Sequence, residues 1–168
     1  MTAHIIRSLN LLARTIALLV SVMALITAFA VVVRAADGVV RLPAENVVVA
    51  TTAGDFTFAA ELATSDKDRS VGLMFRRSMG ERQAMLFYWD EPEPVSMWMR
   101  NTYIPLDMLF VAGDGTVVHV AADTVPHSLK TISANRDVSA VMEINAGTAA
   151  KLGIRAGSRL LHRFFNRS

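Results

Sequence analysis

The sequence predicts an α+β domain, a compact, β-rich, barrel-like sheet with two short helices, preceded by an N-terminal apolar export helix. Three observations support this fold class. Many short apolar or alternating stretches are separated by glycine, proline and acidic turns, only two stretches after the export segment carry helix signals, and residues 1–36 have the composition of an export segment. A chain of 168 residues with such a segment has room for one further domain.

The first 36 residues are predicted to be a signal peptide or a membrane anchor. Arg7 and Arg14 precede an uncharged run over residues 15–33, and Ala35 and Ala36 follow it. This order of basic, apolar and small residues is typical of a secretory signal. The run is also just long enough to span a bilayer as a helix. A cleaved signal and an uncleaved anchor are both consistent with this pattern. Both predict an extracytoplasmic domain, in the periplasm or cell envelope, and the anchor would contact the membrane through residues 15–33.

Residues 37–46 are predicted to be a linker, and residues 47–165 a single β-rich domain. A short strand is expected over residues 47–50. Residues 55–63 alternate between an apolar face and a polar face that includes Glu61, which predicts a second strand. Ser65, followed three residues later by Asp68, resembles a capping box and predicts a helix over residues 66–75. Gly72 lies inside that helix, where close packing against a neighbouring backbone would explain it.

The second half of the domain is predicted to form mainly strands. Strands are expected over residues 84–89 and 95–99 around a proline-bearing acidic loop, and over residues 108–112 and 116–122 around the hairpin signal Gly113-Asp114-Gly115. A further strand covers residues 138–144. Asn145 is expected to cap a helix over residues 146–152, which Gly153 ends. Residues 159–165 are expected to close the sheet.

Composition excludes several classes of protein. Without the arginines of residues 1–36, the chain keeps 14 basic and 15 acidic residues, so no nucleic-acid partner is expected. The absence of cysteine excludes a disulfide scaffold, a zinc-thiolate site and a thiol nucleophile. No pair of histidines has metal-ligand spacing, and no glycine-rich phosphate loop or serine nucleophile elbow is present. No metal and no cofactor are therefore predicted.

Residues 98–107 carry the densest group of polar side chains. Asp107 lies among apolar neighbours, so its carboxylate needs hydrogen bonds or a cation, for which Arg76, Arg77 and Arg100 are available. In one interpretation Asn101, Thr102, Asp107 and an arginine form a polar pocket at one end of the sheet. In the other, Asp107 accepts backbone N–H bonds and holds a turn, while Asn101 and Thr102 cap local amides.

Two further site hypotheses follow from single residue types. If the fold brings Glu143 near Asp107, two carboxylates could act as acid and base, although exposed strand carboxylates are commoner. Met97 and Met99, with His119 or His127, could bind copper(I). However, methionine is more often a flexible core residue, and Trp98 would face away from both sulfurs in a regular strand.

Taken in order, the motifs of residues 46–163 resemble those of the exported bacterial and archaeal family called domain of unknown function 192 (DUF192). The resemblance implies one small β-rich domain behind a signal peptide or anchor, and no assigned activity. Three positions depart from the family pattern: Ala84 replaces a usual glycine, Met97 a common aromatic residue, and Ser158 a usual acid. The motifs that carry the resemblance are Gly72-Leu73-Met74 with Arg76, Met85-Leu86-Phe87, Trp98-Met99 with Asn101-Thr102, Pro105-Leu106-Asp107, Phe110, Asp114-Gly115, and Glu143 with Ala146-Gly147. The family's recurring polar positions correspond to Arg76, Asn101, Thr102, Asp107 and Glu143.

The sequence thus favours a non-enzymatic binding or accessory module outside the cytoplasm, for a small polar or saccharide-like ligand or an envelope protein partner. Trp98 would supply an apolar platform and the polar residues directional hydrogen bonds. The alternatives are an envelope hydrolase that uses Asp107 and Glu143, and methionine-based copper handling. The predicted ligand-binding residues are Arg76, Trp98, Arg100, Asn101, Thr102, Asp107 and Glu143.

Overall fold

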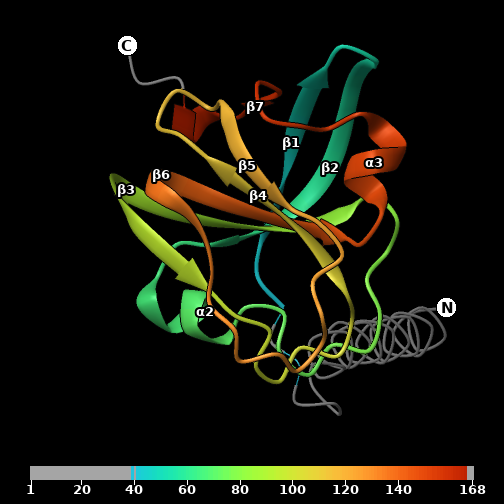
Figure 1. The fold of residues 1–168 in the computed structure, drawn as a ribbon, viewed down its shortest axis with the longest axis vertical. Coiled ribbons are helices and arrows are strands. Elements are labelled where there is room, and N and C mark those ends of the chain that lie inside the picture. Colours follow the sequence, from blue (N-terminus) through green and yellow to red (C-terminus); the bar gives the residue numbers. More distant parts are fainter. Residues whose placement is uncertain (1–38, 40, 166–168) are drawn as a thin grey trace, which may run out of the picture. The chain divides into compact units, whose positions relative to one another are not determined.

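A computed structural model describes residue 39 and residues 41–165, so the predicted export segment lies outside the described residues. The described part is mostly β: a seven-stranded half-barrel sheet with two short helices (Figure 1), which confirms the predicted fold class. The strand order is β5-β4-β6-β3-β2-β1-β7, and β2 and β3 form the one parallel pair in that sheet. No helix among these residues is long and apolar enough to cross a membrane. The strands are β1 (Ala44–Thr51), β2 (Gly54–Ala63), β3 (Gln83–Met97), β4 (Leu106–Val111), β5 (Val117–Ala121), β6 (Ile132–Asn145) and β7 (Arg159–Leu161).

The first elements match the predicted order but differ at their ends. β1 begins at Ala44, inside the predicted linker, because residues 44–51 pair antiparallel with residues 54–61 of β2. Helix α2 (Asp66–Val71) begins as predicted, since the Ser65 hydroxyl accepts the Asp68 N–H at 3.1 Å. It ends at Gly72 rather than at residue 75. Gly72 has a φ of 50°, and a Cβ there would lie 2.9 Å from the Phe87 ring, so this glycine ends the helix and allows close packing.

The two strands predicted over residues 84–89 and 95–99 are one long strand, β3. Its pairing with β6 shifts register between Tyr88 and Glu93 and again between Pro94 and Ser96. Pro92 and Pro94 lie in this irregular part, where the missing N–H groups of proline are tolerated. The acidic, proline-bearing segment is therefore a distorted part of the strand and not a separate loop.

The predicted hairpin is confirmed, and it helps to bring the two edges of the sheet together. Gly115 has a φ of 85°, and its carbonyl oxygen accepts the Leu160 N–H at 2.8 Å. Thr116 forms an isolated bridge with Arg159, at the start of β7. The closing strand is shorter than predicted, because residues after Leu161 turn into the short 3₁₀ helix η1 (Arg163–Phe165).

The second helix is shorter than predicted and is not capped by Asn145. Helix α3 covers Thr148–Leu152, and the residue before it is Gly147, with a φ of 77° and no side-chain cap. The Asn145 side chain instead donates to the Met79 and Gly80 carbonyl oxygens. These partners lie 66 and 65 residues away along the chain, so the bonds that compete with capping form only in the folded domain.

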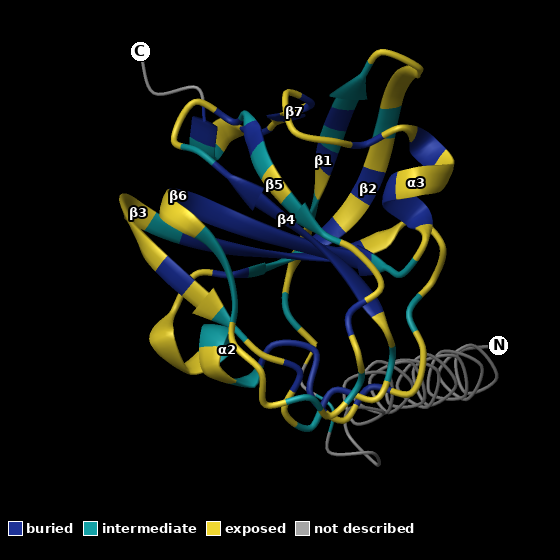
Figure 2. Cartoon of the chain, in the orientation of Figure 1, coloured by how far each residue is buried: buried dark blue, intermediate teal, exposed yellow. Residues whose placement is uncertain are grey.

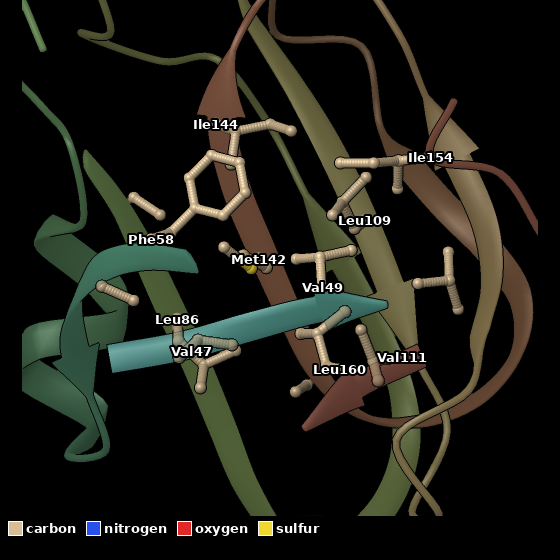
Figure 3. Close-up of a cluster of buried hydrophobic side chains, with 14 of the residues drawn as sticks. Val47, Val49, Phe58, Leu86, Leu109, Val111, Met142, Ile144, Ile154 and Leu160 are labelled. Carbon is tan, nitrogen blue, oxygen red and sulfur yellow. The ribbon is translucent and has the colours of Figure 1, made fainter. Parts of the chain in front are cut away.

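The central strands are largely buried, as their dark blue colour in Figure 2 shows, and each face of the sheet carries an apolar cluster. Phe58, Leu109 and Met142 belong to the larger cluster, part of which is drawn in Figure 3. Met85 and Met108 belong to a second cluster on the opposite face. Because side chains alternate along a strand, neighbouring residues of β4 or β6 contribute to different clusters.

Candidate functional site

A pocket of about 350 Å³ opens between α2, with the turn that follows it, and the chain from the end of β3 to Thr102. This volume lies at the lower end of the range for small-molecule sites, about 300–1,000 Å³. Glu143 of β6 reaches it from the sheet. The lining residues are Asp66, Arg69, Ser70, Val71, Gly72, Leu73, Met74, Phe87, Trp89, Ser96, Met97, Trp98, Arg100, Thr102 and Glu143.

Glu143 is the buried polar side chain of this pocket. It lies in register with Met85 of β3 and Met108 of β4, so it projects from the face that carries the second apolar cluster. Only 4% of the residue is exposed. Within the described part of the chain, no hydrogen bond to its carboxyl group is found. A buried carboxyl group without a partner that borders a pocket has hydrogen-bonding capacity for a bound molecule.

Burial changes the protonation state of this carboxyl group. Desolvation raises the pKa of Glu143 from 4.5 to about 8, while the nearby positive charge of Arg76 acts in the opposite direction. The side chain is therefore mainly a neutral carboxylic acid at pH 7. In that form it both donates and accepts hydrogen bonds.

Arg76 lies close enough to Glu143 for its charge to act on that carboxyl group, and it forms an ion pair with Glu61. The two guanidinium nitrogens donate to the two Glu61 oxygens at 2.6 Å each, and Arg76 is only 2% exposed. Burial opposes ionisation of Glu61, but the bonds from Arg76 and from the Leu42 N–H outweigh it, so the pKa of Glu61 lies below its ordinary value. Arg76 therefore acts on the pocket through its charge, and it does not belong to the residues that line it.

Trp98 and Arg100 form an exposed part of the lining. Trp98 is 47% exposed, and the Arg100 guanidinium lies 4.4 Å from its ring centroid, a distance at which a cation interacts with an aromatic face. Thr102 is buried beside them. Four of the predicted ligand-binding residues thus share this pocket: Trp98, Arg100, Thr102 and Glu143.

Two lining residues, Arg69 and Trp89, were not predicted from the sequence. The Arg69 guanidinium lies 5.2 Å from the Trp89 ring centroid and donates to the Tyr88 carbonyl oxygen at 2.7 Å. Trp89 follows Phe87 with the two-residue period of a strand face, which is a signal that could have indicated it. Nothing local in the sequence connects Arg69 with that face.

Asn101 does not line the pocket but shapes the turn beside it. Its φ is 57°, and its carbonyl oxygen accepts the Phe75 N–H at 2.8 Å. Asparagine tolerates this left-handed conformation better than most residues. Its side chain donates to the Met74 sulfur at 3.9 Å, so the bond to the Phe75 N–H comes from the Asn101 backbone and not from its side chain.

Asp107 lies on the other face of the sheet from Glu143. In the pairing of β4 with β6, Asp107 is opposite Ile144 and Met108 is opposite Glu143. The two carboxyl groups therefore project from opposite faces, and the structure does not bring together the acid–base pair of the hydrolase hypothesis. Fully buried, Asp107 accepts the Asp123 N–H at 2.9 Å and the Ala149 N–H at 2.8 Å. These bonds hold a turn and the start of α3.

The Asp107→Asn variant should be less stable than the wild type by about 1–3 kcal/mol, because an amide offers one acceptor oxygen where two N–H groups need one each. Urea unfolding at neutral pH measures the difference. Asp114→Asn is a matched control, since Asp114 bonds the Thr116 N–H in an exposed turn. Equal stability of Asp107→Asn and the wild type would contradict a holding role for Asp107.

The two methionines of the copper hypothesis differ in how far they are buried. Met97 lines the pocket, whereas Met99 is fully buried and its sulfur accepts the Thr124 hydroxyl at 3.2 Å. Met97 packs against the apolar cluster that contains Met99, as expected of methionine as a core residue. Across residues 41–165, no group of three or more histidine, aspartate or glutamate side chains is arranged to hold a metal ion.

The domain is similar to two solved structures. One is a “putative transcription regulator” from Sinorhizobium meliloti 1021, with 44% identity and a TM-score of 0.71, over 74% of this chain and 97% of that chain. The other is a protein of unknown function from Novosphingobium aromaticivorans DSM 12444, with 36% identity and a TM-score of 0.71, over 75% of this chain and 95% of that chain. No match is found among curated proteins.

The match to a family agrees with the motifs and the fold. The model of the DUF192 family, described as an uncharacterised ACR, matches residues 48–162. This range contains all seven strands except the first residues of β1, and it contains every residue of the pocket. The chain therefore belongs to the DUF192 family.

Proposed function

We propose that this domain is a non-enzymatic binding module that takes a small polar, saccharide-like ligand in the Glu143 pocket. The observation that carries the proposal is the combination of a buried carboxyl group without a partner among the described residues and an exposed tryptophan in one pocket. A tryptophan face packs against the C–H surface of a sugar ring, and directional polar groups then select the hydroxyl pattern.

The charges at the pocket favour a ligand rich in hydroxyl groups. Neutral Glu143 can donate to one hydroxyl and accept from another. Arg100 and Thr102 add donors at the same opening. A strongly cationic ligand fits less well, because Arg69, Arg100 and the charge of Arg76 all lie close to the pocket.

The proposed location is outside the cytoplasm, in the periplasm or cell envelope. It follows from the apolar run over residues 15–33 and the basic residues before it. There the module would act as a soluble binding protein if the segment is cleaved, or as an anchored one if it is not.

The hydrolase alternative has weaker support. A buried acid with a raised pKa, such as Glu143, is typical of a general acid. However, such an enzyme needs a second carboxyl group at the same substrate site, on the other side of the bond that is cleaved. Asp107 projects from the other face of the sheet, and Glu61 is held by both nitrogens of Arg76. Asp66, the other carboxylate in the lining, is paired with Arg69.

A thermal-shift screen with neutral, amino and acidic mono- and disaccharides tests the binding proposal. We expect at least one sugar to raise the melting temperature of the wild type. Trp98→Ala should weaken the binding of that sugar by about tenfold or more, since a lost aromatic contact costs about 1.5 kcal/mol or more.

The control for this variant is Phe75→Ala, which also removes an exposed aromatic side chain but lies outside the pocket lining. It should bind the sugar as the wild type does. Equal binding by Trp98→Ala and Phe75→Ala, or no response to any sugar, would argue against the proposal.

A further inference from the structure

Three loops at one end of the sheet expose apolar side chains that no part of the pocket uses. They are residues 72–79, 98–105 and 124–131, and they gather at the bottom of Figure 1. Phe75 is 43% exposed, Tyr103 39%, and Val125 and Leu129 68% each. We call this surface the loop face, formed by Phe75, Arg77, Tyr103, Val125, His127, Leu129 and Lys130.

Contacts between the loops hold this face together. The Phe75 and Tyr103 rings meet edge to face with centroids 6.1 Å apart, and the His127 ring lies 5.1 Å from that of Tyr103. The His127 N–H donates to the Thr102 carbonyl oxygen at 3.2 Å. Phe75 and Tyr103 are thus neighbours in one surface and are not scattered singly, which is the pattern of an interaction site.

Phe75 is held in a conformation that its side chain does not favour. Its φ is 65°, in the left-handed region, and its N–H is bound to the Asn101 carbonyl oxygen. For a bulky residue such a conformation is costly and is retained where the surroundings enforce it, often at functional surfaces. Here it displays an aromatic ring to solvent instead of burying it.

The charge of the three loops has one sign. They contain Arg76, Arg77, Arg100 and Lys130 and no acidic residue. Of these, Arg76 is buried against Glu61, whereas Arg77 is exposed and its guanidinium lies 5.8 Å from the Tyr103 ring centroid. Basic residues beside exposed aromatic and aliphatic residues suit the interface of a membrane with anionic lipids.

The chain enters the domain at this same end. The Leu42 N–H donates to Glu61 at 2.7 Å, and Leu42 packs in the apolar cluster that also contains Met79 and Ile104, from two of the three loops. Only residues 34–41 separate Leu42 from the apolar run over residues 15–33. An extended chain of this length spans roughly 30 Å. If that run enters a bilayer, the loop face lies within reach of its surface.

We propose that the loop face docks onto an anionic phospholipid surface, with Phe75, Tyr103 and Leu129 among the headgroups and Arg77 and Lys130 near the lipid phosphates. This inference rests on the proposed export of the domain and not on a ligand in the Glu143 pocket. Docking would give the domain a second membrane contact if residues 15–33 are an anchor, and its principal contact if they are cleaved.

Vesicle sedimentation of residues 37–168 tests this proposal. This part contains every described strand and both apolar clusters, and the two similar solved chains consist almost entirely of the matching domain. We expect binding to phosphatidylcholine vesicles that contain about 30% phosphatidylglycerol, weak binding to phosphatidylcholine alone, and loss of binding as salt increases.

The test variant is Phe75→Asn with Leu129→Ser. Asparagine tolerates the left-handed conformation better than phenylalanine, so the backbone at residue 75 should be no more strained in the variant than in the wild type. Vesicle binding should fall about tenfold or more. Leu161→Ser, on β7 at the opposite end in Figure 1, removes an equally exposed side chain (45%) and should bind vesicles normally.

Three results would overturn the proposal: no binding to the anionic vesicles, equal loss of binding in the Leu161 control, or a dimer of the wild type in sedimentation velocity that the Phe75→Asn/Leu129→Ser variant abolishes. The last result would assign the loop face to a second copy of the chain. The vesicle assay contains no sugar and the thermal-shift screen contains no lipid, so failure of the pocket proposal and failure of this one are distinguishable.

Discussion

The Glu143→Gln variant should become progressively more stable than the wild type as the pH rises from about 4.5 to about 8. The pKa of Glu143 is raised from 4.5 to about 8 in the folded domain, so the folded state holds its proton where the unfolded chain has lost it. Stability then falls with rising pH, because the unfolded state binds fewer protons over this window. The total effect is at most roughly 5 kcal/mol, and most of it is present by pH 7.

Urea unfolding of both proteins at several values between pH 4 and pH 9 measures this difference. Glutamine is uncharged at every pH and has nearly the same shape, so subtracting its curve from that of the wild type removes the contribution of other titrating groups. Below pH 4.5 the two proteins should be equally stable to within about 1 kcal/mol. A difference that does not change with pH would contradict a buried, protonated Glu143.

Binding in the pocket should follow the same titration. If the neutral acid donates a hydrogen bond to the sugar, affinity falls above about pH 8 in the wild type and stays constant in Glu143→Gln.

Removal of the Arg76 side chain should be the most destabilising single change beside the pocket. Arg76→Met leaves the half-buried Glu61 carboxylate without the two 2.6 Å bonds that offset its desolvation. Breaking a buried ion pair in this way costs about 3–5 kcal/mol. Unfolding in urea at pH 7 gives the value.

A double variant separates the loss of the pair from the loss of packing. Arg76→Met with Glu61→Leu replaces both charges, so it should recover most of the stability that Arg76→Met loses. Arg163→Met is the exposed comparison, because it breaks an ion pair in which the Arg163 side chain is 63% exposed and the Glu45 side chain 40%. It should lower the stability much less than Arg76→Met does. A small effect of Arg76→Met, equal to that of Arg163→Met, would contradict this account.

The sequence predicts local elements well where the signal is itself local. The Ser65–Asp68 capping pair fixes where α2 begins, and Gly113-Asp114-Gly115 fixes the hairpin, because both act through neighbouring backbone groups. The end of α2 is different. From the sequence, Gly72 is predicted to lie inside a helix. In the structure the Phe87 ring of β3 occupies the space that a side chain at residue 72 would need.

A smaller part of the candidate site could be predicted in the same way. Trp98, Arg100 and Thr102 are close in sequence and meet at the pocket, so their grouping is a local property. Arg69 and Trp89 were missed because α2 and β3 meet only through the fold. Asp107 was grouped with this site because it adjoins the same segment, yet it faces the other way.

The polar face assigned to β2 shows the limit most clearly. Alternation places Glu61 opposite Phe58 and Ala60, which suggests a solvent-exposed side. In the structure that side is exposed at Thr57 and Ala59, but towards the end of β2 Ala63 belongs to the second apolar cluster and Glu61 is paired with the buried Arg76. The alternation of apolar and polar residues identifies the two faces of a strand, but it does not tell whether loops cover the polar face.

By itself, the sequence determined the family, the β-rich fold class, the hairpin and the start of α2, and it carries the export prediction. These follow from contiguous patterns, whose physical basis is local backbone geometry and the period of a strand. Only the tertiary structure decided that Asp107 and Glu143 lie on opposite faces, because strand register relates residues far apart in the chain. It also decided the protonation of Glu143, since a carboxyl pKa depends on how completely the packed neighbours exclude water.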